Sequence, residues 1–256
     1  MKTISASKAD GLLQKTTLLD YDAPAIQRLI KERRWQSLPE RERIRSIYEF
    51  VRDEILFGYN RADEMPASEV LSDGFGQCNT KATLLMALFR AVGLRCRFHG
   101  FTIHKELQKG AITGIWYRLA PKEIVHSWVE VQLENEWFFL EGVILDRPYL
   151  KALQERSKRS AGSTRNDGSR SGDSNDRSQS YCGFGACTND IMNPVVDFEG
   201  NHTYIQADGI ARDFGLYNDP DSFYAEHSQA LSPLKKWLFS HYIRHRMNDN
   251  VRRIRG

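Results

Sequence analysis

Cys78 is the residue whose position most directly suggests chemistry. It follows two closely spaced glycines, Gly74 and Gly76, and apolar residues then recur at helical spacing as far as Gly93. The pattern predicts that Cys78 lies at the N-terminus of a helix, where unpaired backbone N–H groups and the positive end of the helix dipole favour a thiolate over a thiol. The thiolate is the nucleophilic form of cysteine. A buried structural cysteine could have the same surroundings, so a base is needed to decide between the two.

His126 is the candidate base. Polar and apolar residues alternate over residues 126–133, a short polar turn follows at residues 134–136, and a second extended stretch begins at Trp137. Antiparallel pairing of these two strands brings the start of the first near the far part of the second. We therefore expect His126 and Glu141 to lie side by side, which would supply a base and an acid to orient it.

These segments resemble the transglutaminase-like superfamily. The resemblance covers roughly residues 40–150 and rests on several motifs in the family's order. The motifs are residues 67–71 leading into Gly76-Gln77-Cys78, the helix end at residues 88–94, the strand at residues 126–131, and Trp137 four residues before a carboxylate. The resemblance implies an α+β fold with a papain-like core, in which the cysteine-bearing helix packs against an antiparallel β-sheet. It also implies a Cys-His-acid triad at Cys78, His126 and Glu141.

Two positions depart from the family pattern. The family usually has an aspartate where this chain has Glu141, but a glutamate can also accept a hydrogen bond from the imidazole N–H. Asp146, five residues further on, is the alternative acid. Asn79 stands where animal transglutaminases carry a tryptophan, so the acyl-acceptor specificity of those enzymes does not carry over.

The predicted reaction is acyl transfer through a thioester. Cys78 would attack an amide carbonyl, His126 would take the thiol proton and return it to the leaving amine, and Glu141 would fix the imidazole orientation. The backbone N–H of Cys78 would hold the oxyanion, and the Gln77 side chain is the candidate second donor. Such chemistry requires no cofactor and no metal, and its substrate would be a peptide or protein amide. Amide hydrolysis and protein cross-linking use the same triad, and a non-catalytic peptide- or protein-binding module is the alternative function.

The long connection at residues 105–124 ends close to the candidate base. Its aromatic residues, Trp116 and Tyr117, are candidates for one wall of a substrate cleft, together with Trp128 on the first strand; packing on the core is the equal alternative for the two loop residues. His99 and His104 are rival bases. We favour His126 because it combines strand context with a paired acid.

Composition excludes several function classes. The 256 residues include 36 basic and 33 acidic ones, and the formal net charge of +3 is too balanced to indicate nucleic-acid binding. No apolar run reaches the roughly twenty residues of a membrane span. The N-terminal residues lack the apolar core of a signal peptide, and the four cysteines are too few and scattered for a disulfide scaffold, so we expect a cytoplasmic protein.

The chain divides by composition into three parts. Residues 1–155 hold N-terminal helices and the transglutaminase-like core, residues 156–180 form a polar low-complexity insertion expected to be disordered, and residues 181–256 are an extension packed on the core. The extension ends in a basic amphipathic helix, for which docking on its own domain is favoured over a membrane surface or a partner. Cys182 and Cys187 could form half of a metal site, but no second ligand pair follows.

Overall fold

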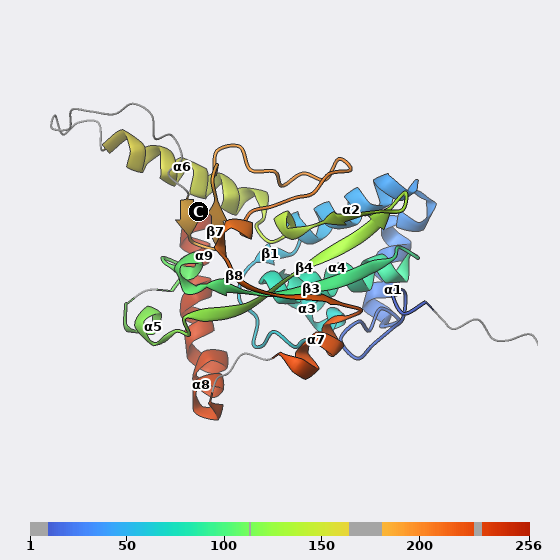
Figure 1. Cartoon of the computed structure of the whole chain (residues 1–256), viewed down its shortest axis with the longest axis horizontal. Coiled ribbons are helices and arrows are strands. Elements are labelled where there is room, and N and C mark those ends of the chain that lie inside the picture. Colours follow the sequence, from blue (N-terminus) through green and yellow to red (C-terminus); the bar gives the residue numbers. More distant parts are fainter. Residues whose placement is uncertain (1–9, 113, 164–180, 228–231) are drawn as a thin grey trace, which may run out of the picture.

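The structure is a computed structural model that describes residues 10–112, 114–163, 181–227 and 232–256. A four-stranded antiparallel sheet in the order β5-β4-β3-β8 lies at its centre (Figure 1). The strands are β3 (Cys96–His104), β4 (Glu123–Leu133), β5 (Glu136–Phe139) and β8 (Ile210–Tyr217). The edge strand β8 comes from the C-terminal part of the chain, so residues 181–256 contribute to the main sheet as well as covering it.

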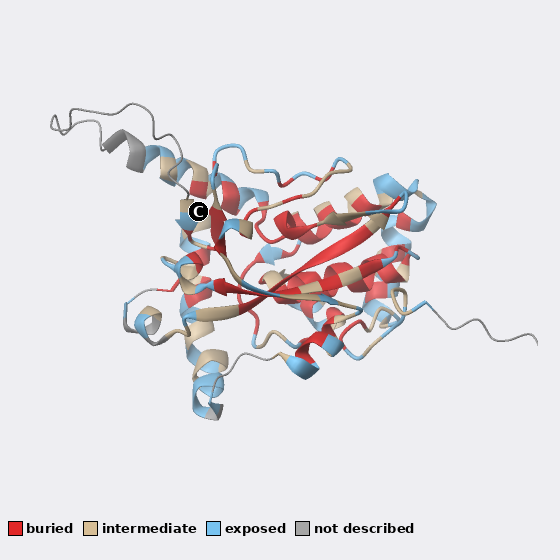
Figure 2. Cartoon of the chain, in the orientation of Figure 1, coloured by how far each residue is buried: buried red, intermediate tan, exposed pale blue. Residues whose placement is uncertain are grey.

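Helix α4 (Cys78–Ala91) packs against β3 and β4 and is enclosed on nearly all sides, with every residue from Asn79 to Arg90 buried. Figure 2 shows the buried residues concentrated in this helix and the two central strands. The expected α+β fold, with the cysteine-bearing helix against an antiparallel sheet, is confirmed. Because the helix is covered on all sides, its polar residues are buried too and find partners inside the protein, as Lys81 does at the carbonyls of Arg52 and Ile144.

The expected N-terminal helices cover α4 on its other side. They are α1 (Pro24–Arg33), the 3-10 turn η1 (Trp35–Ser37) and α2 (Glu40–Asp53), followed by β1 (Leu56–Phe57), α3 (Ala67–Asp73) and β2 (Phe75–Gly76). Strands β1 and β2 pair in parallel and lead directly into the cysteine helix. Buried Ile44, Ile47 and Val51 form the predicted apolar face of α2.

The predicted hairpin of β4 and β5 is present, and its turn explains the register. Glu134 and Asn135 both adopt positive φ, at 52° and 69°, and Leu133 pairs with Glu136. Two consecutive left-handed residues match the strand twist of a tight two-residue hairpin. After β5 the chain leaves the sheet through the 3-10 turn η3 (Glu141–Val143).

The connection at residues 105–124 contains the 3-10 turn η2 (Lys105–Gln108) and helix α5 (Gly114–Leu119). Helix α6 (Arg147–Ser163) runs through residues 156–163 of the predicted insertion, and residues 164–180 lie outside the described part. The remaining elements are β6 (Tyr181–Gly183), β7 (Ala186–Thr188), the 3-10 turn η5 (Ala207–Gly209), α7 (Pro220–Glu226), α8 (Pro233–Leu238), the π-helical turn η6 (Phe239–Ile243) and α9 (Arg244–Arg255).

The C-terminal segment packs on its own domain, with Met247 and Val251 of α9 buried. Cys182 and Cys187 face each other across β6 and β7 and form a disulfide, so in this structure they are bonded to each other and form no half-site for a metal. Among the described residues, no helix is both long and apolar enough to cross a membrane.

Candidate active site

Cys78 is the first residue of α4, as predicted from its glycine turn. Gln77 caps the helix: its backbone N–H donates to Thr80 Oγ1 at 3.1 Å, and its side-chain oxygen accepts from the backbone N–H of Asn60 at 2.8 Å. Gly76 is required here, because a Cβ at this position would lie 2.8 Å from Thr80 Oγ1. The thiol therefore sits at the dipole end of a rigid, capped helix.

His126 and Glu141 are both fully buried and face each other. His126 Nε2 lies 3.7 Å from Glu141 Oε1. Burial favours the neutral imidazole, but interactions with Cys78 and Glu141 outweigh it and raise the pKa of His126 to about 9. Cys78 and Glu141 therefore both stabilise the protonated form of the ring.

Glu141 is placed beside the imidazole by the turn η3, whereas pairing of the two strands was expected to place it there. The last ladder pair is Glu130 with Phe139, and Glu141 lies beyond it in the turn η3. Its Oε2 accepts from the backbone N–H groups of Ile205 at 2.5 Å and Gln206 at 2.9 Å, whereas Oε1 is directed to His126. Two backbone donors thus fix the carboxylate and leave one oxygen for the base.

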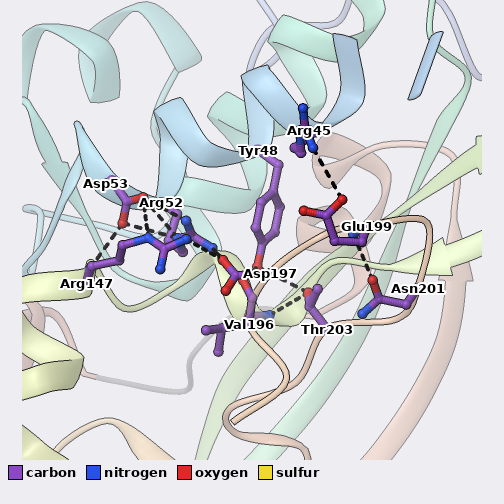
Figure 3. A network of polar contacts seen from close by, with 11 residues as sticks. Arg45, Tyr48, Arg52, Asp53, Arg147, Val196, Asp197, Glu199, Asn201 and Thr203 are labelled. Atoms are coloured by element: carbon purple, nitrogen blue, oxygen red, sulfur yellow. Dashed lines mark hydrogen bonds and ion pairs between the residues drawn. The ribbon is translucent and has the colours of Figure 1, made fainter. Parts of the chain in front are cut away.

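A polar network on α2 supports the segment that holds Glu141 (Figure 3). Tyr48 and Arg52 both donate to the carbonyl of Val196, at 2.7 and 2.6 Å. Tyr48 also contacts Thr203 Oγ1 at 3.3 Å, and that oxygen accepts from the backbone N–H of Gly142 at 3.1 Å. The network therefore connects helix α2 to Val196, to Thr203 and, through Thr203, to Gly142, the residue that follows Glu141.

Asp146, the alternative acid, is engaged elsewhere. Its carboxylate accepts from the backbone N–H groups of Phe57 and Tyr149, at 2.8 and 3.0 Å, and forms an ion pair with Arg255 at 2.6 Å. Burial favours the protonated form, but Arg255 and the backbone donors lower the pKa of Asp146. The acid that lies beside His126 is Glu141.

The rival base His99 is paired with two acids. Its Nδ1 lies 2.7 Å from Glu130 Oε1 and its Nε2 lies 2.9 Å from Asp213 Oδ1. The sequence argument against His99, that it lacks a paired acid, is therefore wrong. Because both of its nitrogens are engaged, neither is left to accept a proton from a thiol.

The remaining predicted site residues are distributed around the site. The Gln77 amide nitrogen donates to Asp63 Oδ1 at 3.0 Å and approaches the Ala62 carbonyl at 3.4 Å, so its donors already have partners. Trp128 is buried between the rings of Phe101 and Phe139. Tyr117 is partly buried beneath Lys105 Nζ at 5.0 Å, and the Trp116 side chain lies outside the described residues.

A cavity of about 300 Å³ opens beside Cys78. Leu107, Ile112 and Ile124 of the predicted connection contribute to its lining, and Phe239 and Ile243 of η6 come from the C-terminal segment. The lining is mostly apolar, as is usual for binding pockets. The C-terminal helix is thus part of the site, which its amphipathic pattern alone did not indicate.

Two further cavity residues escaped the sequence analysis. Asp63 is partly buried, lines the cavity and contacts Gln77. Tyr224 is buried with a hydroxyl that has no hydrogen-bond partner in the structure. Neither has a local sequence signal, since both reach the site through long-range packing.

Comparison with known proteins gives the family of the core. The model of the transglutaminase-like superfamily matches residues 28–142, which include Cys78, His126 and Glu141. Residues 28–142 form a transglutaminase-like superfamily domain. This transglutaminase-like domain covers the catalytic candidates but ends before Ile205, Gln206 and the C-terminal wall of the cavity.

A solved structure is similar to part of the chain. It is the "Putative Cysteine Protease" of Cytophaga hutchinsonii, with 17% sequence identity and a TM-score of 0.38 over 54% of this chain. The match spans 44% of the Cytophaga protein, less than half its length. No curated protein matches the chain in sequence.

Proposed function

We propose that this protein is a cysteine-dependent acyl transferase or amide hydrolase with Cys78, His126 and Glu141 as its triad. The observation that carries the proposal is the alignment of three elements: a helix N-terminus with Cys78, a buried imidazole with a raised pKa, and Glu141 Oε1 at 3.7 Å from that ring. A nucleophile, a base and an orienting acid in this order are the parts of nucleophilic acyl transfer.

In the proposed mechanism, Cys78 attacks the carbonyl carbon of a peptide or protein amide. The C–N bond breaks as His126 returns a proton to the departing amine, which leaves a thioester on Cys78. Water or a second amine then cleaves the thioester. The oxyanion lies at the start of α4, where the backbone N–H of Cys78 is available, and one such donor is worth on the order of 3 kcal/mol in the transition state.

The test is alkylation of Cys78 by iodoacetamide, followed by intact mass over a range of pH. Wild-type Cys78 should react rapidly at neutral pH, and His126→Ala should slow the reaction. His99→Ala is the matched control, because His99 also has paired acids but does not line the cavity with Cys78. Slow labelling that is independent of His126 would contradict the triad.

A second candidate is a non-catalytic module that binds peptides in the same cavity. The observation that favours it is the His126–Glu141 separation of 3.7 Å, which is longer than a hydrogen bond. Catalytic hydrogen bonds are often long in unliganded enzymes, so we rank this candidate second. Peptide binding that persists in Cys78→Ser, together with labelling that does not depend on His126, would favour the module.

A further inference from the structure

Asp63 is a carboxylate in the cavity that the proposed mechanism leaves unused. Its Oδ1 accepts from the Gln77 amide at 3.0 Å, and the Asn79 side chain also hydrogen-bonds to the carboxylate. Among the residues that the structure describes, no Lys, Arg or His nitrogen forms an ion pair with Asp63. Arg61, which is close in the chain, pairs with Glu69 instead.

The surroundings of Asp63 place it beside the reacting groups. Gln77 directly precedes Cys78, and both residues line the same cavity as Asp63. Asp63 also interacts electrostatically with His126. Burial raises the pKa of Asp63, although Gln77 and Asn79 oppose the rise, so its carboxylate would gain from a cationic partner in the cavity.

Tyr224 supplies a second, independent group at this place. Tyr224 lines the cavity, and its buried hydroxyl oxygen has no hydrogen-bond partner among the described residues. Burial raises the pKa of Tyr224 well above 10, with Asp63 and Cys78 contributing in the same direction, so the hydroxyl stays neutral. A buried polar atom without a partner is costly, and a ligand N–H would satisfy it.

We infer that Asp63 and Tyr224 form a subsite for a positively charged amino group of the substrate, next to the bond that Cys78 attacks. An ammonium group has three donors and no acceptor, which suits a carboxylate oxygen and a phenolic oxygen. The rest of the lining is mostly apolar and accommodates the carbon skeleton that bears the amine, and it also includes the cationic residues Arg61, Lys235 and Lys236. The inference rests on the proposed function and specifies its substrate class as amine-bearing acyl compounds, such as peptides with a free amino group.

The test compares two probes that alkylate Cys78 and differ in one group. Alanyl chloromethyl ketone carries a free amino group, and its N-acetyl derivative does not. We expect wild-type protein to react roughly 10- to 100-fold faster with the free amine, the range for one charge-assisted hydrogen bond. Asp63→Asn retains an acceptor for Gln77 but removes the charge, so it should reduce the ratio of the two rates to near one.

Two more variants complete the design. Glu42→Gln, at an exposed acid of α2 that does not line the cavity, is the control and should keep the wild-type ratio. Tyr224→Phe keeps the ring but removes the hydroxyl, so it should lower the ratio several-fold and provides the test if Asp63→Asn does not fold. Equal rates of the two probes in wild-type protein, or an unchanged ratio in both variants, would overturn the subsite. Failure of the proposed function has another signature, in which His126→Ala leaves the rates of both probes unchanged.

Discussion

Glu141 and Asp146 are both buried acids, yet their environments assign them opposite tasks. Glu141 turns one oxygen toward His126 and is otherwise held by two backbone N–H groups. Asp146 has Arg255 as a full ionic partner. At the scale of single residues, the carboxylate proposed for the triad and the structural carboxylate differ in the group that faces them.

Glu141→Gln should lower the pKa of His126 below its value of about 9. Burial already favours the neutral ring, so removing one of the two neighbours that stabilise the imidazolium shifts the titration toward acid. Glutamine preserves an acceptor for the N–H groups of Ile205 and Gln206, and the fold should remain. NMR titration of the His126 ring measures the shift, and an unchanged titration would mean that the two groups do not interact.

Asp146→Asn should instead reduce stability while leaving the His126 titration in place. Arg255 would lose its partner in a mostly buried site, and breaking such a pair costs about 3–5 kcal/mol. Urea unfolding of the variant measures the loss. A stable variant with an altered His126 titration would reverse the roles given to the two acids.

Lys81 makes stability depend on pH near neutrality. It is fully buried on α4 and donates to the carbonyls of Arg52 and Ile144, and burial lowers its pKa to about 7 from 10.5. Between these values the unfolded chain keeps a proton that the native state has lost. Because of Lys81, the free energy of unfolding should therefore increase with pH between about 7 and 10.5, by at most about 1.4 kcal/mol per pH unit. Below pH 7 the amine is charged in both states, and the full cost of burying that charge lowers the stability.

Lys81→Met should remove this part of the pH dependence. Urea unfolding at several pH values from 6 to 10 provides the measurement. Exposed Lys151→Met is the control and should follow the wild-type curve. An identical curve for Lys81→Met would show that the buried amine stays charged throughout.

At the scale of elements, the sequence pattern predicted those parts of the site that are determined by residues adjacent in the chain. The start of α4 at Cys78 follows from the glycine turn, and the β4–β5 hairpin follows from alternation around a polar turn. Glu141 was expected from pairing and resemblance, although the turn η3 delivers it. Asp63 and Tyr224 could not be placed, because their neighbours in space are remote in sequence.

The β6–β7 hairpin is an element whose importance no local pattern revealed. Cys187 N–H donates to the carbonyl of Ile205 at 2.8 Å, and the Gln206 side chain donates to the carbonyl of Gly185. The same residues, Ile205 and Gln206, hold the Glu141 carboxylate. The disulfide hairpin therefore braces the segment that positions the acid.

Replacing Cys182 and Cys187 by serine should weaken this brace. We expect a loss of stability on the order of 2 kcal/mol, together with a lower rate of His126-dependent alkylation at Cys78. Cys96→Ala is the control, since that cysteine is buried at the start of β3 and is not disulfide-bonded. If the double variant keeps the wild-type rate at a reduced thermal stability, the hairpin supports the fold without affecting the acid.

At the scale of the whole molecule, helix α9 fixes the wall of the cavity. Asn248 accepts from the backbone N–H of Tyr59 at 2.7 Å and donates to the carbonyl of the same residue at 3.0 Å. Tyr59 lines the cavity from one side, and η6, which continues into α9, lines it from another. One side chain thus holds two walls together.

Asn248→Ala should loosen both walls. Loss of two buried hydrogen bonds should cost about 2 kcal/mol of stability and slow the reaction of Cys78 with the free-amine probe more than its reaction with iodoacetamide. Asp249→Asn breaks an exposed ion pair with Arg252 and is the matched control, for which we expect wild-type behaviour. Equal slowing with both reagents would indicate a general disturbance of the thiol.

The proposed reacting groups and part of the cavity lining come from different parts of the chain. The superfamily match ends at residue 142 and already contains the three catalytic candidates, whereas Tyr224, Phe239 and Ile243 come from the C-terminal part. Mutations in the later stretch can therefore reshape what enters the cavity while the reacting groups stay intact. Under the proposed function, directed evolution of Tyr224, Phe239 and Ile243 should change which substrates react, while Cys78 remains the nucleophile.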